Sequence, residues 1–286
     1  MDGKQIAASG ALHLIPLDNI NGYDVRPGFY EISGAMALRE GVNFTVCSLE
    51  ASSVELLLYH RGDKEPYAVL PFPKHYRIGS VYSILVFGLD IYDFEYAYRV
   101  DGVHDPEKGL IFDKTKPLLD PYARAVTGQS VWGEQPNQDH DYHARVVVND
   151  FDWGDHADPI KPIEDLIIYE LHVRGFTKDP SSCVSHPGTF DGIREKIPYL
   201  KDLGITAVEL MPVFEFDETM GKREVNGRML LDYWGYNPVS FFAPNTSYTA
   251  NKEFNRVYYM LTPDGMYLQS AMRERPHRER IWSTWH

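Results

Sequence analysis

Three stretches decide the fold: LIIYELHV at Leu166–Val173, FDGIREKIPYLKDLG at Phe190–Gly204 and ITAVELMPV at Ile205–Val213. The first and the last are nearly continuous apolar and β-branched runs, which is typical of strands buried on both faces of a parallel sheet. The middle stretch has helical spacing. Together they predict a strand–helix–strand unit with parallel strands joined by a right-handed crossover.

The helix of this unit has a clear apolar face and one weak point. Four apolar side chains share the face: Ile193, Ile197, Leu200 and Leu203. Gly204 follows them and supplies the left-handed conformation that ends many helices. Pro198 has no amide proton to bond the carbonyl of residue 194, so we expect the helix to bend slightly there.

Upstream of the unit, residues 41–103 consist of short alternating runs separated by Gly, Pro and Asp. This spacing is typical of an antiparallel sandwich. In FEYAYRV, the rings of Phe94, Tyr96 and Tyr98 fall on one face, while Glu95 and the other intervening residues fall on the opposite face. That period of two is the pattern of a half-buried strand, and an all-β domain of roughly one hundred residues is expected.

Several strings of the chain resemble one known family. They are YELHVRGFT at Tyr169–Thr177, TFDGIREKIPYLKDLGITAVELMPVFEF at Thr189–Phe216 and YWGYNPVSFFAPNTSY at Tyr233–Tyr248. These resemble the opening of the catalytic barrel in glycoside hydrolase family 13. With DKTKPLLDPYARAV at Asp113–Val126, the chain looks like the glycogen debranching enzymes and isoamylases, which hydrolyse α-1,6 branch points in glycogen and related glucans. The upstream sandwich is similar to the family-48 carbohydrate-binding module, and the resemblance covers residues from about 20 to 265.

The resemblance and the patterns together imply a multidomain chain. Residues 1–110 are expected to form an immunoglobulin-like β-sandwich, and residues 111–162 a connecting segment that is ordered around Trp132 and Trp153. Residues 163–265 are expected to form an incomplete α/β barrel of the TIM type. Such a barrel needs about 250 residues, so this segment holds only the first two or three βα units.

Three aromatic residues are the candidate substrate-binding residues. Tyr233, Trp234 and Tyr236 lie on a loop after the second barrel strand, where barrel enzymes place their working residues. By the family pattern, Tyr236 stacks on the sugar ring next to the scissile bond, because a π-face suits the C–H face of a pyranose. The alternative is that all three rings pack the barrel rim. Asn237 and Pro238 are expected to turn the chain.

Two sets of polar residues could be mistaken for catalytic groups. Glu170, His172 and Arg174 alternate with apolar residues on the first strand, and a structural polar network is expected of them. Asp217 and Glu218 follow the second strand and are expected to form a solvated turn, since adjacent side chains point apart and a retaining hydrolase needs two carboxyls about 5–5.5 Å apart.

No catalytic residue is assigned, because the family's Asp nucleophile, Glu acid/base and second Asp have no counterpart in this sequence. An internal stretch looks to be missing near residues 252–255. The final residues 266–286, with four Arg and two Glu, leave the resemblance altogether and are expected to be an unrelated, disordered tail. A foreign reading frame is one interpretation of the tail and a basic interaction segment is the other. We therefore expect a debranching lineage without activity, or a non-enzymatic α-glucan-binding protein.

Composition limits the other partners. With 28 Lys and Arg against 41 Asp and Glu, the net charge of -13 repels nucleic acid and anionic lipid. Cys47 and Cys183 lack metal-ligand spacing and the chain has no nucleotide-binding motif, so no metal or cofactor is expected. Neither a signal-peptide run nor a membrane-spanning run is present, which predicts a cytoplasmic protein with an α-glucan partner and leaves the oligomeric state open.

Overall fold

The computed structural model describes residues 14–127, 131–134, 142–148 and 162–250, together with the backbone of Met260–Leu261 and Tyr267–Leu268. Trp153, the predicted join near residues 252–255 and nearly all of the predicted tail lie outside these residues. Among the residues described, no helix combines the length and the apolar character needed to cross a bilayer.

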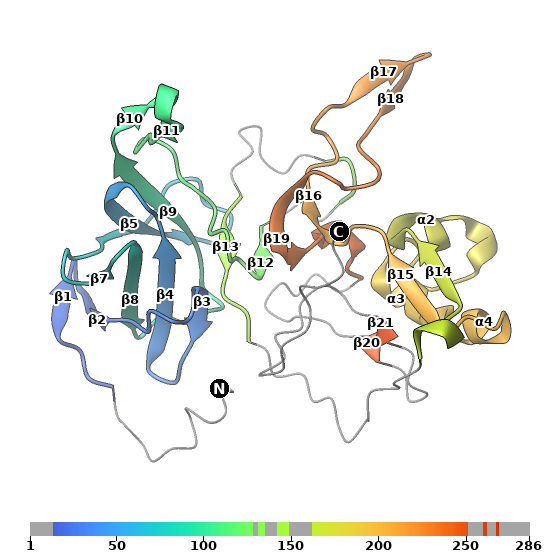
Figure 1. Cartoon of the computed structure of the whole chain (residues 1–286), viewed down its shortest axis with the longest axis horizontal. Helices are drawn as coiled ribbons and strands as arrows, with labels where there is room; N and C mark the ends of the chain where they lie inside the picture. The colour runs from blue at the N-terminus through green and yellow to red at the C-terminus, as the bar shows by residue number, and fades with distance from the viewer. Residues whose placement is uncertain are drawn as a thin grey trace.

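The N-terminal part is an antiparallel sandwich, as the sequence predicts (Figure 1). Its first sheet has the order β1-β2-β8-β4-β3, with β7 also paired to β8. The bounds are β1 (Asp18–Ile20), β2 (Tyr23–Pro27), β3 (Gly34–Ala37), β4 (Gly41–Cys47), β7 (Arg77–Ile78) and β8 (Val81–Phe87).

The second sheet has the order β12-β13-β9-β5-β6. Its strands are β5 (Ala51–His60), β6 (Ala68–Pro71), β9 (Phe94–Gly102), β12 (Ala125–Val126) and β13 (Ala144–Arg145). A small hairpin of β10 (His104–Asp105) and β11 (Leu110–Ile111) extends from β9 and is joined by the 3-10 helix η1 (Pro106–Lys108). Because β12 and β13 come from the predicted connecting segment, the sheet continues past residue 110.

Strand β9 confirms the predicted alternation on its core side. Phe94, Tyr96 and Tyr98 are buried in the core between the sheets. The opposite face is not solvated as the half-buried pattern indicates, because Glu95 and Ala97 are also buried. Ala97 packs there in a small separate cluster with Leu57 and Tyr59.

The predicted strand–helix–strand unit is present. Strands β14 (Ile168–Leu171) and β15 (Ala207–Leu210) pair in parallel. Both were expected to be buried, but Ile168 is 55% exposed. The reason is that β14 and β15 form a sheet of two strands and are the only parallel pair within residues 162–250. An incomplete barrel therefore stays a prediction beyond this first unit.

The helix of the unit is broken rather than slightly bent. It forms α3 (Phe190–Glu195) and α4 (Ile197–Asp202), separated at Lys196, because Pro198 cannot continue the hydrogen-bond ladder and starts a new helix instead. Ile193, Ile197 and Leu200 are buried as predicted, whereas Leu203 is 53% exposed. Gly204 has φ +85°, which confirms the left-handed stop.

Among the remaining elements, a short antiparallel strand pair lies between the sandwich and this unit (Figure 1). Strands β16 (Phe214–Phe216) and β19 (Pro238–Pro244) pair antiparallel, and β17 (Arg223–Val225) and β18 (Arg228–Leu230) form an exposed hairpin that projects from them (Figure 1). Short helices are α2 (Val173–Lys178), η2 (Ile163–Asp165), η3 (Pro180–Ser182) and η4 (Thr246–Tyr248). The backbone of β20 (Met260–Leu261) pairs with that of β21 (Tyr267–Leu268), at the start of the predicted tail.

Candidate functional site

The three predicted aromatic residues lie on one turn, residues 232–237, which we call the aromatic loop. Its first residue, Asp232, donates its backbone N–H to the carbonyl of Glu218 at 2.8 Å. Gly235 has φ +76°, and a Cβ atom there would lie 2.7 Å from the ring of Phe216. The loop therefore folds closely over β16 and needs glycine at this position.

Tyr233 is held in place by His172. Its ring stacks on that of His172, with centroids 4.3 Å apart and planes inclined by 13°. His172 Nδ1 accepts the backbone N–H of Gly175 at 3.0 Å, so its Nε2 carries the proton and donates to the Tyr233 carbonyl at 2.7 Å. Burial lowers the pKa of His172, and a neutral imidazole fits this pattern of bonds.

Trp234 and Tyr236 are placed differently. They are 61% and 65% exposed, and their rings meet edge to face with centroids 6.3 Å apart. This exposed pair can meet a ligand, and Tyr233, which is 41% exposed, also supports the loop by stacking on His172. Contact with a sugar stays a prediction for all three residues.

The predicted polar network of the first strand is present only in part. His172 caps α2 and also lies 3.2 Å from the hydroxyl of Tyr248. Arg174 lies over the ring of Trp132, with the guanidinium carbon 4.4 Å from the centroid. Glu170, however, is exposed and takes no part in the cluster, because on β14 it lies on the same face as the exposed Ile168 and opposite to the buried Leu171.

The prediction of a solvated turn at Asp217 and Glu218 is wrong. Asp217 is 3% exposed and Glu218 is fully buried, because η4 packs over the end of β16. Asp217 accepts bonds from the backbone N–H and the hydroxyl of Thr219. Ser247 of η4 donates its hydroxyl to Glu218 Oε1 at 3.3 Å.

Glu218 is an unusual carboxyl group in this cluster. Its second oxygen, Oε2, is buried without a hydrogen-bond partner among the described residues. Burial raises the pKa of Glu218 from 4.5 to about 7, and the nearby charge of Asp217 adds to the effect. The sequence near Glu218 does not indicate this burial. The one signal is the string NTSY, in which Asn245 caps a turn that brings Ser247 to Glu218.

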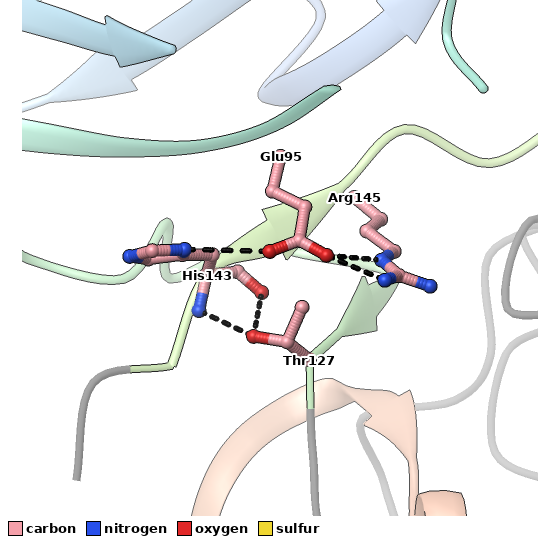
Figure 2. Close-up of polar contacts among 4 residues, drawn as sticks. All are labelled: Glu95, Thr127, His143 and Arg145. Atoms are coloured by element: carbon pink, nitrogen blue, oxygen red, sulfur yellow. Dashed lines mark hydrogen bonds and ion pairs between the residues drawn. The ribbon is translucent and has the colours of Figure 1, made fainter. Parts of the chain in front are cut away.

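The sandwich holds a second buried polar group on the outer face of its second sheet. Glu95 is 1% exposed, accepts from the Nε of Arg145 at 3.0 Å and lies 3.4 Å from His143 Nδ1 (Figure 2). Thr127 is bonded to the backbone of His143 in both directions, and the His143 ring stacks on Tyr59 at 3.8 Å. Burial opposes ionisation of Glu95, yet hydrogen bonds from His143 and Arg145 hold its pKa below the ordinary value. This group is a closed ion-paired network.

The described residues contain no group of three or more His, Cys, Asp or Glu side chains that could hold a metal ion. Both cysteines, Cys47 and Cys183, are free and exposed.

Comparisons with known proteins agree with both parts of the chain. Residues 33–123 match carbohydrate-binding module 48, the isoamylase N-terminal domain, and residues 137–269 match the α-amylase catalytic domain. Isoamylase SU1 of Zea mays is 36% identical over 232 residues, which are 76% of this chain and 28% of that protein. The glycogen debranching enzyme of Salmonella paratyphi B is 35% identical over 77% of this chain and 34% of its own length.

Solved structures show the same fold. The pullulanase of Paenibacillus barengoltzii superposes with a TM-score of 0.59 and 23% identity, over 79% of this chain and 33% of that one. The chain thus spans about a third of the length of the proteins it matches. With a carbohydrate-binding module 48 joined to part of an α-amylase catalytic domain, it belongs to the isoamylase and glycogen debranching family of glycoside hydrolase family 13.

Proposed function

We propose that this chain recognises α-glucans through the aromatic loop and comes from a lineage that hydrolyses α-1,6 branch points of glycogen or related glucans. The observation that carries the proposal is the exposed edge-to-face pair of Trp234 and Tyr236, backed by Tyr233 on His172. Aromatic faces suit the C–H faces of pyranose rings, while the edges leave the sugar hydroxyls in water.

We further propose that the 286-residue chain does not hydrolyse glucans. A retaining hydrolase needs two carboxyls about 5–5.5 Å apart on either side of the scissile bond. Asp217 and Glu218, which follow β16, are buried under η4 and engaged by Thr219 and Ser247, and Asp232 in the loop accepts the backbone N–H of Gly235 at 3.4 Å. On this proposal, Asp217 and Glu218 support the aromatic loop and do not contact a bound sugar. On this proposal the chain acts as a glucan-binding protein, in the cytoplasm, although the Zea mays relative is described as chloroplastic.

Affinity electrophoresis in gels with and without glycogen tests the proposal, together with a reducing-sugar assay on amylopectin. We expect glycogen to retard the chain without release of linear chains, and the change Tyr236→Ala to remove most of the retardation. Tyr199→Ala is the matched control, because Tyr199 is 54% exposed on α4, away from the loop. Release of linear chains would contradict the loss of catalysis, and absence of retardation would contradict glucan recognition.

A further inference from the structure

Trp132 lies in the segment between β12 and β13, yet its ring contacts side chains of the catalytic part, by which we mean residues 162–250 within the match to the α-amylase catalytic domain. The indole stacks on Tyr248, with centroids 6.1 Å apart and planes inclined by 12°. It meets Phe216 edge to face at 5.8 Å and Tyr233 edge to face at 5.9 Å. Aromatic pairs at these distances attract beyond the simple burial of their area.

Two further contacts fix the place of Trp132. The guanidinium of Arg174 lies over the indole at 4.4 Å, which is within the range of a cation–π interaction. The next residue, Gly133, has φ +80°, and a Cβ atom there would lie 2.8 Å from Cδ1 of Leu231. The backbone beside Trp132 therefore runs closely along the residue that precedes the aromatic loop.

Through these contacts Tyr233 is bounded on two sides. His172 stacks on its ring and Trp132 meets it edge on. Because Trp234 follows Tyr233 directly in the chain, the position of Tyr233 determines the position of the exposed Trp234–Tyr236 pair.

We propose that Trp132 is a positioning residue for the aromatic loop: it fixes Tyr233, and through it the Trp234–Tyr236 pair, from a segment outside the catalytic part. Arg174 assists by holding the indole. The inference rests on the proposed function only in taking an α-glucan as the ligand of the loop.

Three variants of the full chain test this role: Trp132→Ala, Trp132→Phe and Arg174→Met. The first readout is retardation in glycogen gels. Loss of the three ring contacts of Trp132 is expected to weaken glycogen binding about tenfold in Trp132→Ala, while Trp132→Phe keeps most of the affinity. Arg174→Met keeps the apolar stem and should lose about two- to fivefold through the cation–π contact. Tyr199→Ala serves again as the control.

The second readout is the NMR resonance of the His172 Cε1 proton, identified by its absence in His172→Asn. Because His172 stacks on Tyr233, its chemical shift reports the position of that ring without any ligand. We expect the resonance to move in Trp132→Ala and to return toward its original position in Trp132→Phe.

The inference would be overturned if Trp132→Ala bound glycogen with normal affinity and its His172 resonance did not move. It would also be overturned if Trp132→Ala bound glycogen normally and differed from the original chain only in a lower unfolding midpoint. Should Trp132→Ala not fold, an Arg174→Met chain with unchanged affinity and resonance would overturn it. If glycogen does not retard even the original chain, the proposed function fails, while the His172 resonance still decides the role of Trp132.

Discussion

Glu218 makes the stability of this protein depend on pH in a direction opposite to that of most carboxylates. Its side chain is fully buried under η4, and the folded state raises its pKa from 4.5 to about 7. The unfolded chain therefore loses this proton at lower pH than the folded chain. The contribution of Glu218 is fully present below about pH 4.5 and is lost as the pH rises to about 7.

The size of the effect follows from the two pKa values. A difference between 4.5 and about 7, at about 1.4 kcal/mol for each pH unit, corresponds to about 3 kcal/mol of unfolding free energy. In Glu218→Gln the side chain has nearly the same shape and does not ionise. Relative to the original chain, this variant should gain about 3 kcal/mol between about pH 4.5 and about pH 8.

Urea unfolding followed by tryptophan fluorescence measures this difference at the two ends of the pH range. Comparing the two chains at each pH cancels the titration of other groups, including Asp120, whose pKa burial raises to about 6. Glu224→Gln, on the exposed strand β17, should show no such gain. A free-energy difference between Glu218→Gln and the original chain that stays constant across this range would refute the reasoning.

Two other substitutions test the packing around the candidate site and the sandwich. Gly235→Ala places a Cβ atom 2.7 Å from the Phe216 ring on a residue with φ +76°. This change should lower the unfolding free energy by about 1–3 kcal/mol and weaken glycogen retardation. Equal urea midpoints for the variant and the original chain would contradict the close fit of the loop. Glu95→Gln removes the charge that pairs with the guanidinium of Arg145, whose side chain is 11% exposed, and should cost about 3–5 kcal/mol by urea unfolding. Glu55→Gln on the neighbouring strand, whose ion pair with Arg99 is about one-third exposed, is the matched control and should cost less than about 1 kcal/mol; a similar loss in both variants would argue against a special role for burial.

Local patterns in the sequence predict the elements well where neighbours along the chain decide them. The core-facing positions in Phe94–Tyr98, the left-handed Gly204 and the parallel pairing of two apolar runs all depend on short stretches of backbone, and the structure has each of them. The break at Lys196 was underestimated because proline also favours the first turn of a new helix.

The polar residues were harder to predict because their environment comes from distant segments. Nothing near Asp217 and Glu218 in sequence indicates that η4, about thirty residues later, will cover them. Glu95 faces away from the sandwich core and looks solvent-exposed until His143 and Arg145, nearly fifty residues on, close over it. Tyr233 and Trp234 are neighbours in sequence and both are exposed, but only the placement of His172 and Trp132 shows that the Tyr233 ring also supports the loop.

The contacts between β19 and the sandwich connect the N-terminal module to the aromatic loop. Strand β19 leaves the aromatic loop and passes beside β12 (Figure 1), where Ser240 donates its hydroxyl to the carbonyl of Ala123 at 3.3 Å and Phe242 stacks on Tyr122 at 5.5 Å. Ala243 is fully buried within the hydrophobic core of the sandwich itself. Any displacement of the sandwich would therefore pull on the strand that follows Tyr236, just as displacement of Trp132 would disturb Tyr233 before it. The module and its adjoining segment thus hold both ends of the aromatic loop, and removing them should disorder the loop.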